Sequence, residues 1–373
     1  MQYRAYGKGG PEISRLGFGA MRLPQRQGGG WGSVNFTKSV EVIRAAMEAG
    51  VNLLDSHHRY HEGNSELAIG KALKGWKGQR IYVQTKTPWY KKEPRRYFEK
   101  LLDEALQKTG VGCIDYLLHH SMDMEMFKNR GREFIRFTDW AMKRGLIRHR
   151  GFSSHDTPKN IRKFIDTGEF SVMLVSYNWM KREDQDVIAY AAKKGMGVTI
   201  MNPIQGGTLA TTTPQVLRLL PGAKSAAEIA LRYVLATPGV TGTLSGMNTL
   251  AQVHENTAVA GRAEPMTPRQ WKAMQDRIKL SEKAAKNACT ACGYCMPCPH
   301  GVDIPANLRI VNQIRFFGRI QYANHLYGRL RRAKPADKSA GVCKKCGKCE
   351  PKCPNDVHII RDLRELSKSM EKK

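Results

Sequence analysis

Four side chains of types suited to proton transfer follow or lie close to the ends of apolar segments. Leu53-Leu54 runs into Asp55, and Tyr60 comes five residues after that acid. The strand-like segments 81–85 and 114–118 end in the same way, at Lys86 and His119. Such runs are typical of buried strands, and a parallel barrel presents its catalytic groups at the carboxyl ends of several strands. We therefore predict a proton-transfer site built from these four residues.

Each of the four residue types has a definable task in such a site. Tyrosine alone has a pKa near 10 and is a poor acid at neutral pH. An ammonium from Lys86 would lower the pKa of Tyr60, and a carboxylate from Asp55 would fix that ammonium in place. His119 would donate a hydrogen bond to a substrate oxygen. Taken singly, each residue also suits a buried ion pair or a satisfied core position.

The histidines of the same region leave a second reading open. His57, His58 and His61, together with His119 and His120, are residue types that bind transition metals. Their spacing matches no standard metal motif.

The last quarter of the chain is rich in metal-binding residues. Eight of the nine cysteines of the whole chain lie between residues 289 and 353. The second block spaces three cysteines by two residues and ends, after a three-residue gap, in Cys-Pro; this is the bacterial iron–sulfur pattern. The first block is similar but one residue shorter before its last cysteine. In this pattern the Cys-Pro cysteine binds the other cluster. We predict one [4Fe–4S] cluster on Cys289, Cys292, Cys295 and Cys353, and another on Cys343, Cys346, Cys349 and Cys298. Paired zinc sites are the alternative.

Strand-like and helix-like segments alternate about eight times over the first 260 residues, which predicts a parallel sheet closed into a (β/α)8 TIM barrel. The composition becomes more polar and basic after Gly261. We place the domain boundary near Pro265, giving a barrel over residues 1–264. Residues 265–373 would form a helical linker and a mainly α-helical, ferredoxin-like domain with two [4Fe–4S] clusters.

Residues 1–260 resemble the aldo/keto reductase family. The resemblance rests on Asp55, Tyr60, Lys86 and His119, on the segment Gly151-Phe152-Ser153-Ser154, and on Gly246 through Asn256. It implies that Tyr60 gives a proton to a carbonyl while hydride arrives from a nicotinamide cofactor, NAD or NADP. Residues 286–360 resemble the two-cluster ferredoxin-like domain that is fused to one branch of this family.

The resemblance also implies a set of cofactor-binding positions, and several of them depart from the family pattern. Ser154 stands in place of an asparagine, Leu174 in place of a glutamine, and Met201 in place of an aromatic residue. Gly246 and Gln252 replace the lysine and arginine that would hold the 2′-phosphate of NADP. The predicted cofactor positions are Ser153, Ser154, Asn202, Gly206, Gly207, Gly246, Gln252, Glu255 and Asn256.

The formal net charge of the chain is +28. About half of it, roughly +14, lies in residues 261–373. This charge suits a solvated surface, a docking face for an acidic ferredoxin or flavodoxin, or a nucleic-acid contact. No apolar run approaches the roughly 20 residues that span a bilayer, and the start carries no export signal, so we expect a cytoplasmic protein.

These features predict an oxidoreductase that acts on a small carbonyl or alcohol, with the C-terminal clusters relaying electrons. Hydride transfer moves two electrons together, whereas each cluster carries one, so the clusters are either redox-active or structural. One alternative is an electron-transfer protein whose barrel is a scaffold without nicotinamide binding. A second is a basic nucleic-acid-binding protein.

Overall fold

A computed structural model describes residues 1–28, 32–89, 92–283, 289, 293–353 and 356–371. The chain divides into two compact units. Unit 1 comprises residues 1–209 and 230–267, and unit 2 comprises residues 210–229 and 268–373. The segment 210–229 lies inside the barrel domain that the sequence suggests, yet it groups with the C-terminal part.

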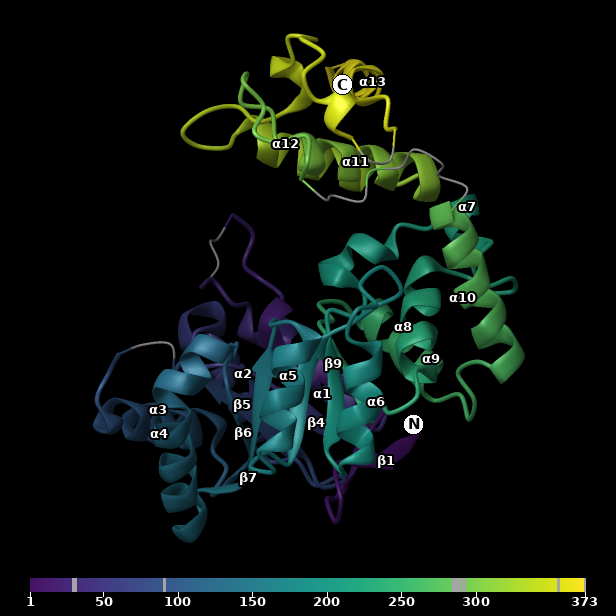
Figure 1. The fold of residues 1–373 in the computed structure, drawn as a ribbon. Coiled ribbons are helices and arrows are strands. Elements are labelled where there is room, and N and C mark those ends of the chain that lie inside the picture. Colours follow the sequence, from purple (N-terminus) through teal and green to yellow (C-terminus); the bar gives the residue numbers. More distant parts are fainter. Residues whose placement is uncertain (29–31, 90–91, 284–288, 290–292, 354–355, 372–373) are drawn as a thin grey trace. The chain divides into compact units, whose positions relative to one another are not determined.

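Unit 1 is a closed barrel of parallel strands in the order β10-β3-β4-β5-β6-β7-β8-β9 (Figure 1). The predicted TIM barrel is therefore confirmed. The strands are β3 (Leu16–Gly19), β4 (Leu53–Asp55), β5 (Tyr82–Thr87), β6 (Ile114–His119), β7 (Ile147–Ser154), β8 (Val172–Ser176), β9 (Gly197–Met201) and β10 (Gly242–Ser245).

Helices alternate with these strands and cover the outside of the barrel (Figure 1). The sequence pattern predicts a helix over 131–144, but helix α4 begins at Met124, seven residues earlier. The side chain of Asp123 accepts a hydrogen bond from the Met126 amide at 2.8 Å, which caps the earlier start. The helices are α1 (Phe36–Glu48), α2 (Asn64–Leu73), α3 (Arg95–Thr109), α4 (Met124–Lys143), α5 (Pro158–Asp166), α6 (Gln185–Lys193), α8 (Ala226–Ala236) and α9 (Leu250–Ala260).

An N-terminal hairpin is formed by β1 (Tyr3–Ala5) and β2 (Glu12–Ser14). Tyr6, directly after β1, packs in the barrel interior. The Tyr6 hydroxyl lies 3.0 Å from Gln84 Oε1 and 2.9 Å from Thr199 Oγ1. Tyr116 and Leu118 of β6 belong to the same interior cluster. Because side chains alternate along a strand, the next inward position after Leu118 is residue 120.

Unit 2 is built from α7 (Pro214–Leu217), α10 (Pro268–Lys283), α11 (Ile304–Phe317), α12 (Ile320–Arg331) and α13 (Ile359–Glu371). The sequence pattern predicts a mostly helical basic stretch over 308–330. In the structure this stretch forms two helices, because Gly318, with a φ of +60°, ends α11. The Thr213 hydroxyl donates to the Phe317 carbonyl at 2.9 Å, which ties the 210–229 segment to α11. Within the described residues, no helix is long and apolar enough to cross a membrane.

Candidate functional site

A buried ion pair at the carboxyl ends of β4 and β5 forms the centre of the barrel site. Lys86 Nζ lies 2.6 Å from both carboxylate oxygens of Asp55 and 2.7 Å from the Ser56 carbonyl oxygen. Gln84 Nε2 donates to Asp55 Oδ2 at 2.8 Å. Burial acts to lower the pKa of Lys86, but the charge of the Asp55 carboxylate outweighs this effect. The pKa of Lys86 is therefore raised on balance, and the amine stays charged.

Tyr60 lies directly beside this pair. Lys86 Nζ is 5.3 Å from the centre of the Tyr60 ring. Burial raises the pKa of Tyr60, and the neighbouring Lys86 only partly offsets that rise. The expected lowering of the pKa by the ammonium is therefore not the net result, because the Asp55 carboxylate neutralises much of the positive charge. The side chain is held as a phenol, which is the form that can give a proton.

Local backbone strain helps to place Tyr60. Tyr60 is the first residue of the short helix η2 (Tyr60–Gly63), in which His61 and Glu62 have φ values of +52° and +58°. Such left-handed conformations are unfavourable for residues other than glycine and persist where the surroundings fix them. One fixing contact is the hydrogen bond that the Leu23 amide donates to His61 Nε2 at 3.2 Å.

The structure does not bring His119 to this site. Its ring packs against Phe134 of α4 at 5.3 Å, and its Nδ1 lies 3.3 Å from the His120 carbonyl oxygen. His119 occupies an outward position of β6, in line with Asp115 and Leu117. The prediction that His119 completes the site is therefore wrong by one residue.

His120 takes that place instead. Its ring lies 4.1 Å from that of His57, and the charges of Lys86 and His58 act on it. Burial, aided by those charges, lowers the pKa of His120 to about 3, so the ring is neutral. The alternation of inward residues along β6 is the sequence signal that would have found it.

Several histidines thus gather at the barrel mouth. The His57 ring lies 4.2 Å from that of His58 and 5.2 Å from the Tyr60 ring. In the described part of the chain, no three His, Cys, Asp or Glu side chains are placed to hold one metal ion. The histidine metal site considered from sequence therefore has no support among these residues.

His119 makes a testable contribution to the pH dependence of stability. Burial lowers its folded-state pKa to about 3, from about 6.5 in an unfolded chain. Acidification from pH 7 to pH 5 then protonates the unfolded state alone, and removes about 2 kcal/mol of unfolding free energy through this residue. H119L should lose about that much less than the wild type in urea unfolding followed by tryptophan fluorescence. The exposed His325 provides the control variant H325L; equal losses in H119L and wild type would contradict the assignment.

Two of the predicted cofactor-binding glycines, Gly206 and Gly246, lie against Arg22, a residue that the sequence pattern did not indicate. Arg22 ends the short helix η1 (Ala20–Arg22), which follows β3. A Cβ added at Gly206 would lie 2.6 Å from Arg22 Nη2, and one at Gly246 would lie 3.0 Å from Arg22 Cβ. Gly206 and Gly207 have φ values of +65° and +92°. The exposed Arg22 side chain, the Gly206-Gly207 turn and Gly246 thus lie close together at one part of the rim.

Two residues predicted to contact the nicotinamide, Ser153 and Ser154, form hydrogen bonds with the protein backbone. The Ser153 hydroxyl accepts from the Ser121 amide at 2.9 Å, and the Ser154 hydroxyl donates to the Met122 carbonyl at 2.7 Å. Both serines therefore hold the turn that follows β6.

The remaining predicted cofactor positions lie around the ends of β9 and β10. Asn202 Nδ2 donates to Ser176 Oγ at 3.3 Å, and buried Asn256 donates to Ser245 Oγ at 3.1 Å. Gln252 accepts from the Asn248 amide at 2.8 Å, and Glu255 is exposed on α9. At Gly246 and Gln252 neither side chain supplies a cation, as the sequence indicated.

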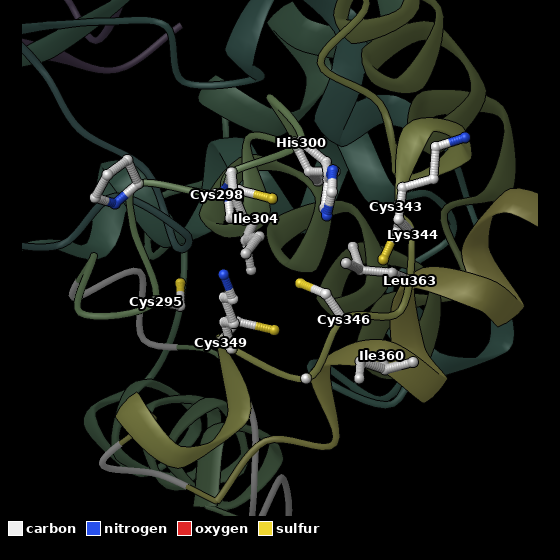
Figure 2. A pocket seen from close by; sticks show the side chains of 15 residues that line it. Cys295, Cys298, His300, Ile304, Cys343, Lys344, Cys346, Cys349, Ile360 and Leu363 are labelled. Carbon is white, nitrogen blue, oxygen red and sulfur yellow. The ribbon is translucent and has the colours of Figure 1, made fainter.

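In unit 2, cysteines from both blocks line one cavity. Figure 2 shows the sulfur atoms of Cys298, Cys343, Cys346 and Cys349 turned toward the same space, with Cys295 at its edge. Apolar side chains, among them Val302, Ile304, Ile360 and Leu363, complete the wall. A thiol-lined cavity with an apolar wall suits an iron–sulfur cluster, whose ligands are thiolates.

Electrostatics agree with this grouping. Burial raises the pKa of the Cys349 thiol, and the charges of Glu350, Cys343 and Cys298 add to that rise. Cys289 and Cys353 pack against the same apolar core as the cavity residues. Cys292 lies outside the described residues.

The comparisons with known proteins follow the same division. The aldo/keto reductase family model matches residues 15–219, and a 4Fe–4S dicluster domain model matches residues 288–358. Both resemblances stated from sequence are therefore confirmed. The C-terminal part is a 4Fe–4S dicluster domain.

Individual relatives are distant but extensive. The chain is 26% identical over 293 residues to L-galactose dehydrogenase of Arabidopsis thaliana, covering 71% of this chain and 90% of that protein. It is 26% identical over 221 residues to NADH-specific methylglyoxal reductase of Escherichia coli, covering 54% and 66%. A solved aldo-keto reductase of Bacillus halodurans in its holo form shares the fold, with a TM-score of 0.64, 24% identity, and coverage of 74% and 96%.

Proposed function

Because the chain belongs to the aldo/keto reductase family and is an oxidoreductase with a 4Fe–4S dicluster domain, we propose that it interconverts a small carbonyl compound and its alcohol with a nicotinamide cofactor. The observation that carries this proposal is the buried Lys86–Asp55 pair in contact with Tyr60. A charged amine, its fixed counter-ion and a protonated phenol meet at the carboxyl ends of barrel strands, where such enzymes do their chemistry.

In reduction, Tyr60 gives its proton to the carbonyl oxygen as that oxygen gains charge. Lys86 stabilises the phenolate that remains, and Asp55 keeps the amine oriented and charged. His120, whose ring is neutral, lies where it can contact the same substrate oxygen. A bound nicotinamide supplies the hydride to the carbonyl carbon. Solvent then returns a proton to Tyr60.

The rim near Arg22 provides the place for the cofactor's pyrophosphate. Gly206 and Gly207 leave the backbone open there, and the Arg22 guanidinium can pair with a phosphate oxygen. Because positions 246 and 252 carry no lysine or arginine for a 2′-phosphate, and Arg22 is assigned to the pyrophosphate, we expect NADH to bind at least as tightly as NADPH.

Titration with NADH and NADPH, followed by cofactor fluorescence, tests the proposal. R22Q should weaken NADH binding by about tenfold, since one charge-assisted contact to the pyrophosphate is lost. R136Q, at an exposed position on α4, should bind as the wild type does. If the wild type binds neither NADH nor NADPH, the proposed use of a nicotinamide cofactor is wrong.

That outcome would favour the second candidate, an electron-transfer protein with a scaffold barrel. One observation speaks for it: the Ser153 and Ser154 hydroxyls, expected at the nicotinamide, are used to hold the turn after β6. Binding of NADH with turnover of no carbonyl compound would fit neither proposal.

For the clusters, we propose the two crossed ligand sets. Cys343, Cys346, Cys349 and Cys298 would hold the cluster in the cavity, and Cys289, Cys292, Cys295 and Cys353 the other. Each [4Fe–4S] cluster carries one electron at a time. The thiolates hold it, and the apolar wall limits access of water.

An acidic ferredoxin or flavodoxin is the electron partner that this domain suits. Cys346 is exposed and flanked by exposed Lys344, Lys345 and Lys348. The nearby carboxylate of Glu350 accepts a hydrogen bond from the Ile360 amide at 3.0 Å. A basic face around an exposed cluster ligand attracts an acidic carrier and shortens the path for the electron.

Replacing Lys344, Lys345 and Lys348 together by glutamine should slow electron exchange with an acidic ferredoxin about tenfold at low salt. The rate of the variant should also depend less on salt, because screening has less charge to act on. Stopped-flow absorbance of the clusters measures this. The control carries glutamine at Lys279, Arg329 and Lys368, which are exposed on α10, α12 and α13. Equal slowing in both triple variants would show that only overall charge matters.

A further inference from the structure

One histidine at the barrel mouth, His57, has no role in the proposed reaction. His57 is buried, with 2% of its surface exposed, and lies two residues after Asp55. Its ring is 5.2 Å from the Tyr60 ring and 4.1 Å from the His120 ring. Among the described residues, His57 Nε2 has no hydrogen-bond partner. Buried polar groups without a partner are rare and call for an explanation.

The hydrogen bond at the other ring nitrogen determines what His57 Nε2 can do. The Arg59 amide donates to His57 Nδ1 at 3.3 Å, so Nδ1 is the acceptor. Burial, together with the nearby His120 and His58, lowers the pKa of His57 and keeps the ring neutral. A neutral imidazole that accepts at Nδ1 carries its proton on Nε2. His57 therefore presents an N–H donor with no acceptor among the described residues.

The position of this donor limits what it can bind. Tyr60 and His120 already serve the reacting carbonyl oxygen in the proposed function. The His57 ring lies beside both of their rings, so a ligand held by Tyr60 and His120 would lie close to His57. A second oxygen on the carbon next to the carbonyl would satisfy the His57 donor.

We propose that His57 Nε2 donates a hydrogen bond to such a second oxygen, and that the substrates are 2-hydroxy or 2-oxo carbonyl compounds. This inference rests on the proposed function, because it names the substrate class of the same site. A site that hydrogen-bonds a substrate oxygen discriminates against the analogue without it, because the buried donor is left unpaired.

Two ketones of nearly equal size test the inference. Hydroxyacetone has a hydroxyl where 2-butanone has a methyl group, and both are assayed with NADH and the holoenzyme. The wild type should prefer hydroxyacetone by about tenfold or more in kcat/KM. H57L should reduce that preference about tenfold, mainly through a higher KM for hydroxyacetone, since the contact is to an oxygen that does not react. H57Q, which keeps an N–H donor, should restore part of the preference.

The outcomes separate the two proposals. H325L, at an exposed histidine on α12, should keep the wild-type preference. Reduction of both ketones by the wild type with equal kcat/KM would overturn the role of His57 while leaving the proposed function in place. An unchanged preference in H57L would do the same. If the wild type reduces neither ketone with NADH or NADPH, the proposed function falls, and the substrate class falls with it. Iron content and thermal unfolding confirm that each variant is folded.

Discussion

Replacement of Tyr60 by phenylalanine is expected to lower carbonyl reduction by about a thousandfold. The variant keeps the ring beside Lys86 but removes the only atom that can give a proton from that position. General acid catalysis by one positioned group contributes about 10²- to 10⁴-fold, so kcat should carry most of the loss. Steady-state oxidation of NADH in the presence of a reducible ketone measures it.

Two further readouts make this expectation specific. Y190F alters a tyrosine whose hydroxyl bonds Asp166 on the outside of the barrel, and it should reduce ketones as the wild type does. Y60F should still bind NADH and retain its iron. A Y60F variant within tenfold of the wild type would show that another group gives the proton.

The raised pKa of Tyr60 also predicts opposite pH profiles for the two directions. Reduction needs the phenol, which predominates below pH 10, so this residue imposes no loss of rate between pH 6 and 9. Alcohol oxidation needs the phenolate, whose fraction rises about tenfold for each pH unit in that range. Oxidation should therefore accelerate with pH in the wild type, and this dependence should be absent in Y60F.

The second large effect concerns the iron content. The wild type should contain about eight irons for each chain, and C346A should contain about four, because loss of one ligand removes one cluster. Unit 2 should also unfold at a lower temperature, since cluster binding contributes to folding. Iron and sulfide analysis of anaerobically purified protein provides the measurement.

Combining two variants tests whether the ligand sets are crossed. If Cys298 and Cys346 bind the same cluster, C298A, C346A and the double variant should each retain about four irons. If Cys298 belongs with its own sequence block, the double variant should lose both clusters. C113A, in the barrel and away from both cysteine blocks, should retain all eight. The shared cavity of Cys298 and Cys346 leads us to expect the first result.

The main features of both units could be predicted from local pattern. Apolar runs ending in Asp55 and Lys86 mark strand ends, and the barrel brings such ends together whatever the loops do. Cysteine spacing identified the cluster domain for a similar reason, because the ligands are close in sequence. The sequence does not distinguish His119 from His120, because the inward face of β6 is established only by the packing of Tyr116 and Leu118.

Other features depend on distant parts of the chain or on net energetics. Arg22 approaches Gly206 and Gly246 from an element about 180 residues earlier in the chain than Gly206, and no local pattern reports that approach. The pKa of Tyr60 follows from a balance between burial and a partly neutralised ammonium, which residue types alone do not determine. Asp123 could have been recognised as a helix cap, since it stands directly before α4.

The segment 210–229 has a consequence for how this protein is made and cut. The chain leaves the barrel unit, contributes Val216, Leu219 and Leu220 to the other unit, and returns before leaving again. A gene fragment that stops at residue 267 would therefore express the barrel together with segment 210–229, but without the rest of unit 2. The apolar side chains of that segment would be exposed, and the fragment should tend to precipitate. During translation that segment must wait for α11 to emerge from the ribosome. No single protease cleavage can release the cysteine-bearing unit intact, because the chain crosses between the units at three places, so separating the two units takes three cuts or a redesigned loop.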